Sequence, residues 1–359
     1  MGRPTSARQG HPVKNTPAGF PLFFDRRKQR IVTADPWAFL SQLAVTKLKK
    51  NREAIALAYI QQGHEFFEAA QNPRLNSRPL LYYYAFLNVV KAALLIRGIA
   101  IPAAAKHGIS DPRANSRKRL RLEGQLVRIT GCVPDQSEIL PEFMSVLGHS
   151  DYLPRSFRIV NLLRLVPSIH RTFVTVEGCP PTFVPIKKID LLHASSKLWA
   201  RIQFDMEDKD VVEALPDLRA RQAFSSCLSQ VESSEDGRVW FETVAVAAKK
   251  RGFDTAISKL AWKLRAIGVG PILTAQGYRF YFANTAPRDF VPYLAAVYCI
   301  AFYLGSVTRY KPDVFDKIIS GRHSWVIAEF LATQPTQFLY ALASDLAGVD
   351  VVGSNATIA

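Results

Sequence analysis

The sequence predicts an α+β fold that is predominantly α-helical, and three observations lead to this prediction. Long apolar helical segments lie near both ends of the chain, at residues 80–96 and 290–307. Between them the pattern changes to short β-branched or alternating stretches, with a hairpin signal at Gln276 and Gly277. At 359 residues and 48% hydrophobic composition, the chain can bury a core without disulfide support. We therefore expect the N- and C-terminal helices to form one bundle, with a β-containing module inserted between them.

Three helices are predicted in the first hundred residues. Asp35 is placed as the N-cap and Pro36 as the first residue of a helix with one apolar stripe. Asn51 is expected to cap a second helix with a wide aromatic face. Pro79 opens the third helix, which is apolar on nearly all sides and closes at Gly98. A helix of this composition belongs in the interior of a bundle.

The rest of the chain mixes strands and helices. We expect a basic loop at 106–121, a strand at 125–130, helices near 137–147 and 156–167, strands at 182–189, 198–204 and 239–246, a helix at 254–266, a hairpin of 270–273 with 278–284, and helices over 288–347. The domain organisation that follows is a flexible basic tail (1–34), the N-terminal part of the bundle (35–121), a β-containing middle module (122–287), the helices that complete the bundle (288–347) and a tail (348–359).

The positive charge is concentrated in the N-terminal part of the chain. The formal net charge is +16, and residues 1–130 hold 22 Lys and Arg against 7 Asp and Glu. Such a segment attracts polyanions by long-range steering and counterion release, which favours RNA, DNA or a phosphorylated ligand as the partner. The candidate contacts to phosphate are Arg26, Arg27, Arg30, Arg78, Arg117, Lys118, Arg119 and Arg121.

Several classes of function are excluded by missing signals. The four cysteines are scattered singly and no Cys/His set has zinc spacing, so we predict no metal, no cofactor and a reducing, cytoplasmic location. The Walker, dinucleotide-binding, serine-hydrolase and zinc-protease motifs are absent. The apolar segment at 80–96 could be read as a membrane span, but Asn88, Lys91 and its polar flanks favour a core helix, and no membrane insertion is expected.

Blocks near the two ends of the chain resemble the YaaC-like protein family of bacteria. They are SRPLLYYYAFLNVVKAALL (77–95), KHGIS (106–110), FYLGSVTRYKPDVF (302–315) and AEFLATQPTQFLYALASDLAG (328–348). The resemblance implies a mostly helical, soluble bacterial protein and names no reaction. It also implies a set of recurrent polar positions, which fall on Arg78, Pro79, Tyr83, Asn88, His107, Gly108, Arg309, Tyr310 and Pro312.

Three of these residues form the candidate catalytic site. If the helices at 80–96 and 290–307 pack together, Arg309, Tyr310 and either His107 or Arg78 can meet at one edge of the bundle. An Arg and a His beside a phosphodiester stabilise developing charge and move a proton, which suffices for RNA cleavage without metal. The structural alternative is that Arg309 complements the dipole at the end of its helix.

The helical layout is also similar to HEPN domains, a bundle class with many RNases of toxin and antiphage systems. Their catalytic motif is an Arg followed a few residues later by a His. In this sequence Arg164 and His170 match it formally. Three functions therefore stay open. The first is a protein that binds RNA or another polyanion in a defence or stress system, the second a metal-independent ribonuclease, and the third a non-catalytic scaffold with a protein partner or a second copy.

Overall fold

The structure is a computed structural model, and two compact units make up the chain. The residues that it describes are 6–13, 31–72, 76–102, 105–112, 121–130, 137–147, 154–205, 207, 211, 227–231, 238–249, 253–274, 277–283, 291–349 and 351–353. The helical unit comprises residues 33–180 and 291–346, and the β-rich unit comprises 1–32, 181–290 and 347–359. The β-rich unit and the middle module expected from the sequence share residues 181–287, because residues 122–180 pack with the helices.

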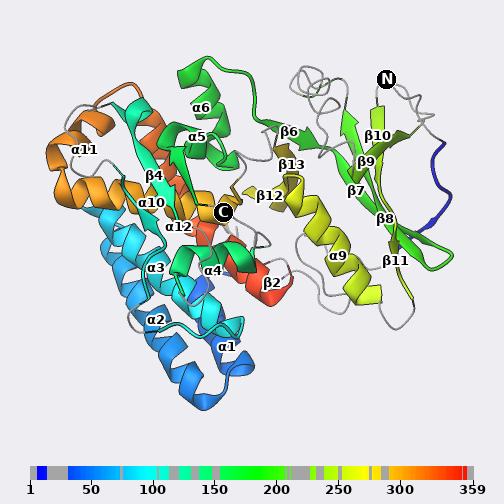
Figure 1. Ribbon diagram of the computed structural model, residues 1–359, viewed down its shortest axis with the longest axis horizontal. Helices are drawn as coiled ribbons and strands as arrows, with labels where there is room; N and C mark the ends of the chain where they lie inside the picture. The colour runs from blue at the N-terminus through cyan, green and yellow to red at the C-terminus, as the bar shows by residue number, and fades with distance from the viewer. Residues whose placement is uncertain are drawn as a thin grey trace, which may run out of the picture. The chain divides into compact units, whose positions relative to one another are not determined.

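The chain has the predicted α+β fold (Figure 1). The helices of the helical unit are α1 (Pro36–Lys47), α2 (Lys50–Ala69), α3 (Arg78–Ile96), α4 (Ile139–Val146), α5 (Ile159–Leu163), α6 (His170–Glu177), α10 (Tyr293–Tyr310), α11 (Pro312–Ile319) and α12 (Ser324–Ala347), with short 3-10 turns at Leu122–Gly124 and Pro167–Ile169. The same unit holds the antiparallel sheet β3-β4-β5, formed by β3 (Ile109–Ser110), β4 (Leu126–Ile129) and β5 (Arg155–Arg158).

The core of the helical unit is built on the crossing of α3 and α10. Both helices are buried along most of their length, as predicted for the two apolar segments. A Cβ at Gly305 would lie 3.1 Å from the Cβ of Tyr83 and 3.2 Å from the Cα of Leu80, so glycine permits this close approach. Of the residues that the structure describes, α3 alone is long and apolar enough to cross a membrane, and 72% of its most apolar window is buried.

The ends of the first two helices show which capping predictions hold. Asp35 Oδ1 accepts hydrogen bonds from the backbone N–H groups of Trp37 at 2.8 Å and Ala38 at 3.0 Å, as predicted for an N-cap. The prediction that Asn51 caps α2 is wrong, because the helix begins at Lys50 and its N-cap is Lys49. Only two residues separate α1 from α2, and this short connection fixes where the second helix starts.

The expected helix at 156–167 is also partly wrong. Its first residues form β5, which pairs with β4 in antiparallel register from Leu126↔Arg158 to Ile129↔Arg155. The helix α5 begins only at Ile159, and α6 follows after a short turn. Phe157 and Ile159 are both buried. The apolar pattern was therefore read correctly as buried, while the switch from strand to helix was missed.

The β-rich unit holds most of the strands. They are β1 (His11–Pro12), β2 (Ile31–Thr33), β6 (Phe183–Ile186), β7 (Lys188–Ala194), β8 (Lys197–Asp205), β9 (Leu228–Val231), β10 (Arg238–Thr243), β11 (Val246–Ala247), β12 (Val269–Thr274), β13 (Gly277–Ala283) and β14 (Val351–Gly353). The larger sheet has the order β1-β7-β8-β10-β9, with β11 also on β8, and the others are β12-β13-β6 and β14-β2.

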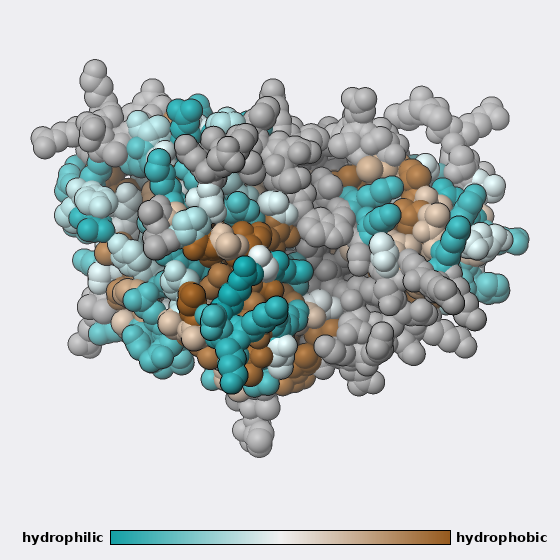
Figure 2. Space-filling model, turned by 60° about the horizontal axis from the view of Figure 1, so that its bottom comes forward, coloured by the Kyte–Doolittle hydropathy of each residue, from teal (hydrophilic) through white to brown (hydrophobic). Residues whose placement is uncertain are grey.

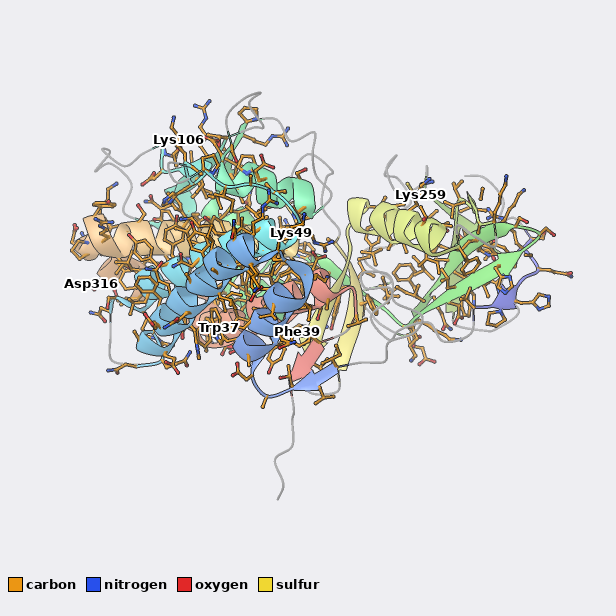
Figure 3. All side chains as sticks on the ribbon, turned by 90° about the horizontal axis from the view of Figure 1, so that it is seen from below. Trp37, Phe39, Lys49, Lys106, Lys259 and Asp316 are labelled. Carbon is orange, nitrogen blue, oxygen red and sulfur yellow. The ribbon has the colours of Figure 1, made fainter. Side chains whose placement is uncertain are left out.

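The predicted hairpin and the predicted helix of this unit are both present. β12 pairs with β13 in antiparallel register, from Thr274↔Gly277 to Val269↔Phe282. The helix α9 (Phe253–Ala266) lies along the larger sheet (Figure 1) and adds Ile257 and Leu260 to one core with sheet residues such as Phe204. Lys259, labelled in Figure 3, is on the exposed side of α9.

Parts of both expected tails have defined structure. Residues 6–13 lie on the larger sheet through β1, and Val13 is buried in its core. At the other end, Val351 and Val352 of β14 are buried. The prediction of flexible tails at 1–34 and 348–359 therefore does not hold for these segments, because β1 pairs with β7 of the larger sheet and β14 pairs with β2.

The surface that carries α1 and α2 mixes apolar and charged side chains. Figure 2 brings this face forward and shows brown hydrophobic residues interleaved with teal hydrophilic ones. Val45 on α1 and Ile55 on α2 are 45% and 50% exposed, whereas Trp37 of α1 is buried against His64. The wide face of α2 predicted from the sequence is thus only partly covered.

Candidate polyanion-binding site

Arg309 and Tyr310, two of the three candidate catalytic residues, lie exposed at the C-terminal end of α10. The Arg309 Nη1 donates a hydrogen bond to the Tyr84 hydroxyl at 3.0 Å. Its Cζ lies 5.0 Å from the centroid of the Tyr310 ring, a cation–π distance. The ring of Tyr84 stacks in turn on Phe66 at 5.3 Å. Arg309 therefore contacts two aromatic side chains, Tyr84 and Tyr310. Tyr84 is backed by Phe66, and Tyr310 is exposed.

His107, the third candidate, is half-buried beside a different tyrosine. Burial raises the pKa of Tyr83 above its ordinary range, and burial followed by the charge of Lys91 lowers the pKa of His107. The Tyr83 hydroxyl, which stays protonated, and Nδ1 of His107 form a hydrogen bond. His107 and Arg309 contact neighbouring tyrosines, Tyr83 and Tyr84, whose ring centroids are 5.5 Å apart.

Arg78 has a structural partner. Its Nε donates to the carbonyl of Ala70 at the end of α2, at 3.0 Å, and its guanidinium lies 5.7 Å from the ring centroid of Tyr82. These contacts join the C-terminal end of α2 to the start of α3. Six other predicted phosphate contacts lie outside the described residues, namely Arg26, Arg27, Arg30, Arg117, Lys118 and Arg119.

Arg121, the remaining predicted contact, lines a pocket of about 570 Å³ in the helical unit. The other lining residues are Leu122, Glu123, Lys317, Ile318, Gly321, Arg322 and His323. We call this the basic pocket. It brings together the segment that follows the basic loop and the connection between α11 and α12. Its volume is in the range of sites that hold a small ligand or a nucleotide.

The three cations of the basic pocket are exposed, and of these Arg322 pairs with Glu177 at 3.8 Å. Arg121 and Lys317 are exposed, and no carboxylate pairs with either among the residues described. The Arg322 Nη2 donates to the carbonyl of Val176 at 2.8 Å. The buried His323 Nε2 lies 2.7 Å from Oε1 of Glu177.

A glycine shapes the wall of the basic pocket. A Cβ at Gly321 would lie 2.8 Å from the carbonyl oxygen of Lys317, a contact that real side chains do not make. Asp316, labelled in Figure 3, is the exposed neighbour of Lys317 on α11. The glycine lets the chain turn tightly between α11 and α12, and this turn presents Lys317 and Arg322 to one pocket.

Comparisons with known proteins identify the family of the chain. A model described as "YaaC-like Protein" matches residues 22–346. The chain belongs to the YaaC-like protein family. No curated protein and no solved structure matches it.

Several positions that the family resemblance singled out have structural roles in this YaaC-like protein. Gly108 has a φ of +73°, and its Cβ would lie 2.2 Å from Cδ of Pro141. The carbonyl of His107 accepts the N–H of Leu140 in the first turn of α4. Pro312 is the first residue of α11, two residues after the end of α10 at Tyr310. The His107-Gly108 pair therefore positions α4.

Arg164 and His170, the formal match to the HEPN motif, lie on either side of a short turn. Burial, followed by the charges of Arg171 and Arg164, lowers the pKa of His170 to about 4. A buried imidazole with this pKa is neutral at pH 7 and packs in the core. Among the described residues no group of three His, Cys, Asp or Glu side chains is placed to hold a metal ion.

The residues of the basic pocket other than Arg121 were not predicted. Lys317, Arg322 and His323 come from a part of the chain with a balanced charge, so composition does not single them out. Their only local signal is the short polar turn Ser320-Gly321-Arg322 between two apolar helices. Their meeting with Arg121 depends on the packing of segments nearly 200 residues apart.

Proposed function

We propose that this YaaC-like protein binds RNA through the basic pocket. The observation that carries the proposal is the pocket of about 570 Å³ in which Arg121, Lys317 and Arg322 converge from distant segments. Cations in a concave site attract phosphate more strongly than the same charges spread over a surface. The net charge of +16 supplies the long-range attraction, and the pocket supplies a defined place for a phosphate group.

Exposed aromatic side chains favour RNA over other polyanions. Trp325 is 50% exposed and lies in the first turn of α12, two residues after His323 of the pocket. Tyr310 is 67% exposed and precedes α11, the helix that contributes Lys317. Rings of this kind stack on unpaired bases and tolerate any sequence. Single-stranded RNA is therefore the ligand that uses both the charge and the rings.

The first test removes Arg121 and Lys317, the two exposed cations of the pocket that pair with no carboxylate among the described residues. We expect Arg121→Ala/Lys317→Ala to bind labelled single-stranded RNA more weakly, with the slope of log affinity against log salt reduced by about 1.4, since each phosphate contact in a single strand contributes about 0.7. Anisotropy titrations at several salt concentrations measure this slope. Lys49→Ala/Lys50→Ala, which removes two exposed cations elsewhere in the same unit, is the matched control. Equal slopes for the two double variants would contradict the proposal.

The second test separates RNA from a bare polyanion. We expect Trp325→Ala and Tyr310→Ala to weaken binding of single-stranded RNA by about 1–3 kcal/mol per stacked base and to leave binding of inorganic polyphosphate unchanged. Val45→Ala, at another exposed apolar side chain, serves as the control. Equal losses for RNA and polyphosphate would show that the rings do not stack on bases.

The same samples test for ribonuclease activity. If Arg309, Tyr310 and His107 cleave RNA without metal, denaturing gels of wild-type reactions will contain product that is absent from Arg309→Ala reactions. Binding without cleavage would assign a non-catalytic role, and the absence of both would favour a scaffold with a protein partner. In each case the gels are run beside the salt titration, so that binding and cleavage are scored separately.

A further inference from the structure

The N-terminal segment 6–13, which we call the N-terminal strap, lies on the larger sheet of the β-rich unit as a peptide lies in a binding groove. It pairs with the edge strand β7 through His11↔His193 and Pro12↔Leu192, and the N–H of Val13 donates to the carbonyl of Leu191 at 2.9 Å. Peptides that add a strand to a sheet edge combine main-chain hydrogen bonds of this kind with pockets for a few side chains.

The first anchor of the strap is Arg8. Its guanidinium donates to the carbonyl of Thr243 at 3.2 Å, lies 3.8 Å from the Glu242 carboxylate and 5.8 Å from the ring centroid of Trp199. The Arg8 carbonyl in turn accepts from Arg201 Nη2 at 2.9 Å. The side chain of Glu242 is 1% exposed and already pairs with Arg201 at 2.6 Å. The buried Glu242 carboxylate, which Arg201 holds in place, favours an arginine at position 8 of the strap.

The second anchor is the space above Trp199, which admits only glycine. A Cβ on Gly10 would lie 2.4 and 2.6 Å from two ring carbons of Trp199 and 3.3 Å from the His193 carbonyl oxygen. The backbone thus rests directly on the indole. Between the anchors, Gln9 is exposed. This edge of the sheet therefore fits an extended sequence in which Arg is followed two residues later by Gly.

We propose that this edge of the larger sheet, at β7 and Trp199, is a peptide-binding site for extended Arg-x-Gly segments, with the N-terminal strap as its resident occupant. Besides the strand pairing, the strap is held by Arg8, Gly10 and the buried Val13, and its other residues from Ser6 to Pro12 are exposed. A partner peptide with the same two anchors can make the same contacts. The proposal is independent of RNA binding.

Because the strap belongs to the same chain as the sheet, the site must be tested in a protein whose strap cannot bind. A segment on the same chain has an effective concentration on the order of millimolar, so the resident strap outcompetes a free peptide of equal intrinsic affinity. In the full-length variant Gly10→Val, the valine side chain collides with the ring of Trp199, so the strap can no longer lie on it. Gln9→Val adds the same side chain at an exposed neighbour and leaves the strap in place.

The experiment titrates a fluorescein-labelled peptide of residues 6–13 into each full-length protein and follows anisotropy. We expect the Gly10→Val protein to bind the peptide and the wild-type and Gln9→Val proteins to bind it at least about tenfold more weakly. An Arg8→Ala peptide should lose at least about tenfold in affinity for the Gly10→Val protein, because a charge-assisted contact is lost. A Gly10→Val peptide should not bind.

Two results would overturn the proposal. One is a Gly10→Val protein that keeps wild-type circular dichroism and does not bind the peptide. The other is equal binding of the native, Arg8→Ala and Gly10→Val peptides, which would show association without recognition. If Gly10→Val does not fold, the full-length Arg8→Ala protein, which weakens the strap without a collision, takes its place in the same titrations.

Discussion

Gly108 and Gly178 share a left-handed backbone but differ in their surroundings. Their φ angles are +73° and +64°. A Cβ on Gly178 would meet nothing within 4 Å, whereas a Cβ on Gly108 would lie 2.2 Å from Cδ of Pro141 and 3.1 Å from the N of Leu140. The two positions therefore separate the cost of backbone strain from the cost of steric collision.

We expect the two alanine variants to differ in stability. Gly178→Ala should lower the free energy of unfolding by about 1–2 kcal/mol, the cost of a left-handed residue with a Cβ. Gly108→Ala should lower it by at least about 3 kcal/mol, because the first turn of α4 must also move. Urea unfolding of both variants measures the difference. Equal losses would mean that α4 shifts freely.

His170 makes stability depend on pH. Its pKa is lowered to about 4 in the folded protein, below the value of about 6.5 for an unfolded chain. The unfolded state therefore binds more protons between pH 6.5 and 4, so stability is highest above pH 6.5 and falls by up to about 3 kcal/mol as the pH drops to 4. Unfolding midpoints across this range should show the fall, and His170→Gln should flatten it. An unchanged slope in the variant would assign the effect to other groups.

At the scale of the element, the start of α1 is fixed by one side chain. Asp35→Ala should lower the free energy of unfolding by about 1 kcal/mol, because two N–H groups lose their acceptor. Asp35→Asn keeps an oxygen in the same place and should cost much less. Thermal unfolding of the two variants gives the comparison, and a loss of equal size in both would point to charge rather than capping.

The elements could be predicted from the sequence where the signal is local. The Asp35-Pro36 start of α1 and the Gln276-Gly277 hairpin depend on neighbouring residues, and both predictions are confirmed. The start of α2 and the strand β5 depend on how the chain packs, and both were missed. Local chemistry predicts caps and turns, whereas the exchange of helix for strand is decided by the partner strand.

The candidate site likewise combines residues that the sequence singles out with residues that only the folded chain brings together. The N-terminal charge excess singled out Arg121, and composition could do this because the basic residues cluster in the sequence. Lys317 and Arg322 belong to a segment without excess charge, and only the folded chain brings them to Arg121. The Arg-x-Gly pattern of Arg8 and Gly10 has no local signal, because its meaning depends on Trp199 and Glu242 in distant strands.

At the scale of the molecule, neither unit is one continuous stretch of sequence. The helical unit takes α3 from residues 33–180 and α10 from residues 291–346. We expect a fragment of residues 33–180 to lack cooperative thermal unfolding, because the face of α3 that packs against α10 has no partner. Co-expression with residues 291–346 should restore it. Cooperative unfolding of the first fragment alone would show that α10 is not needed for the core.

The interleaved order has a consequence during synthesis. α3 ends at Ile96, and α10 ends at Tyr310, more than 200 residues later. At the usual rate of about 5–20 residues per second, a ribosome needs roughly 10–40 s to make the intervening chain. For most of this interval the apolar helix α3 is outside the ribosome without α10, the later of its packing partners. The nascent chain therefore offers chaperones, and the membrane insertion machinery, a hydrophobic segment that the finished protein buries.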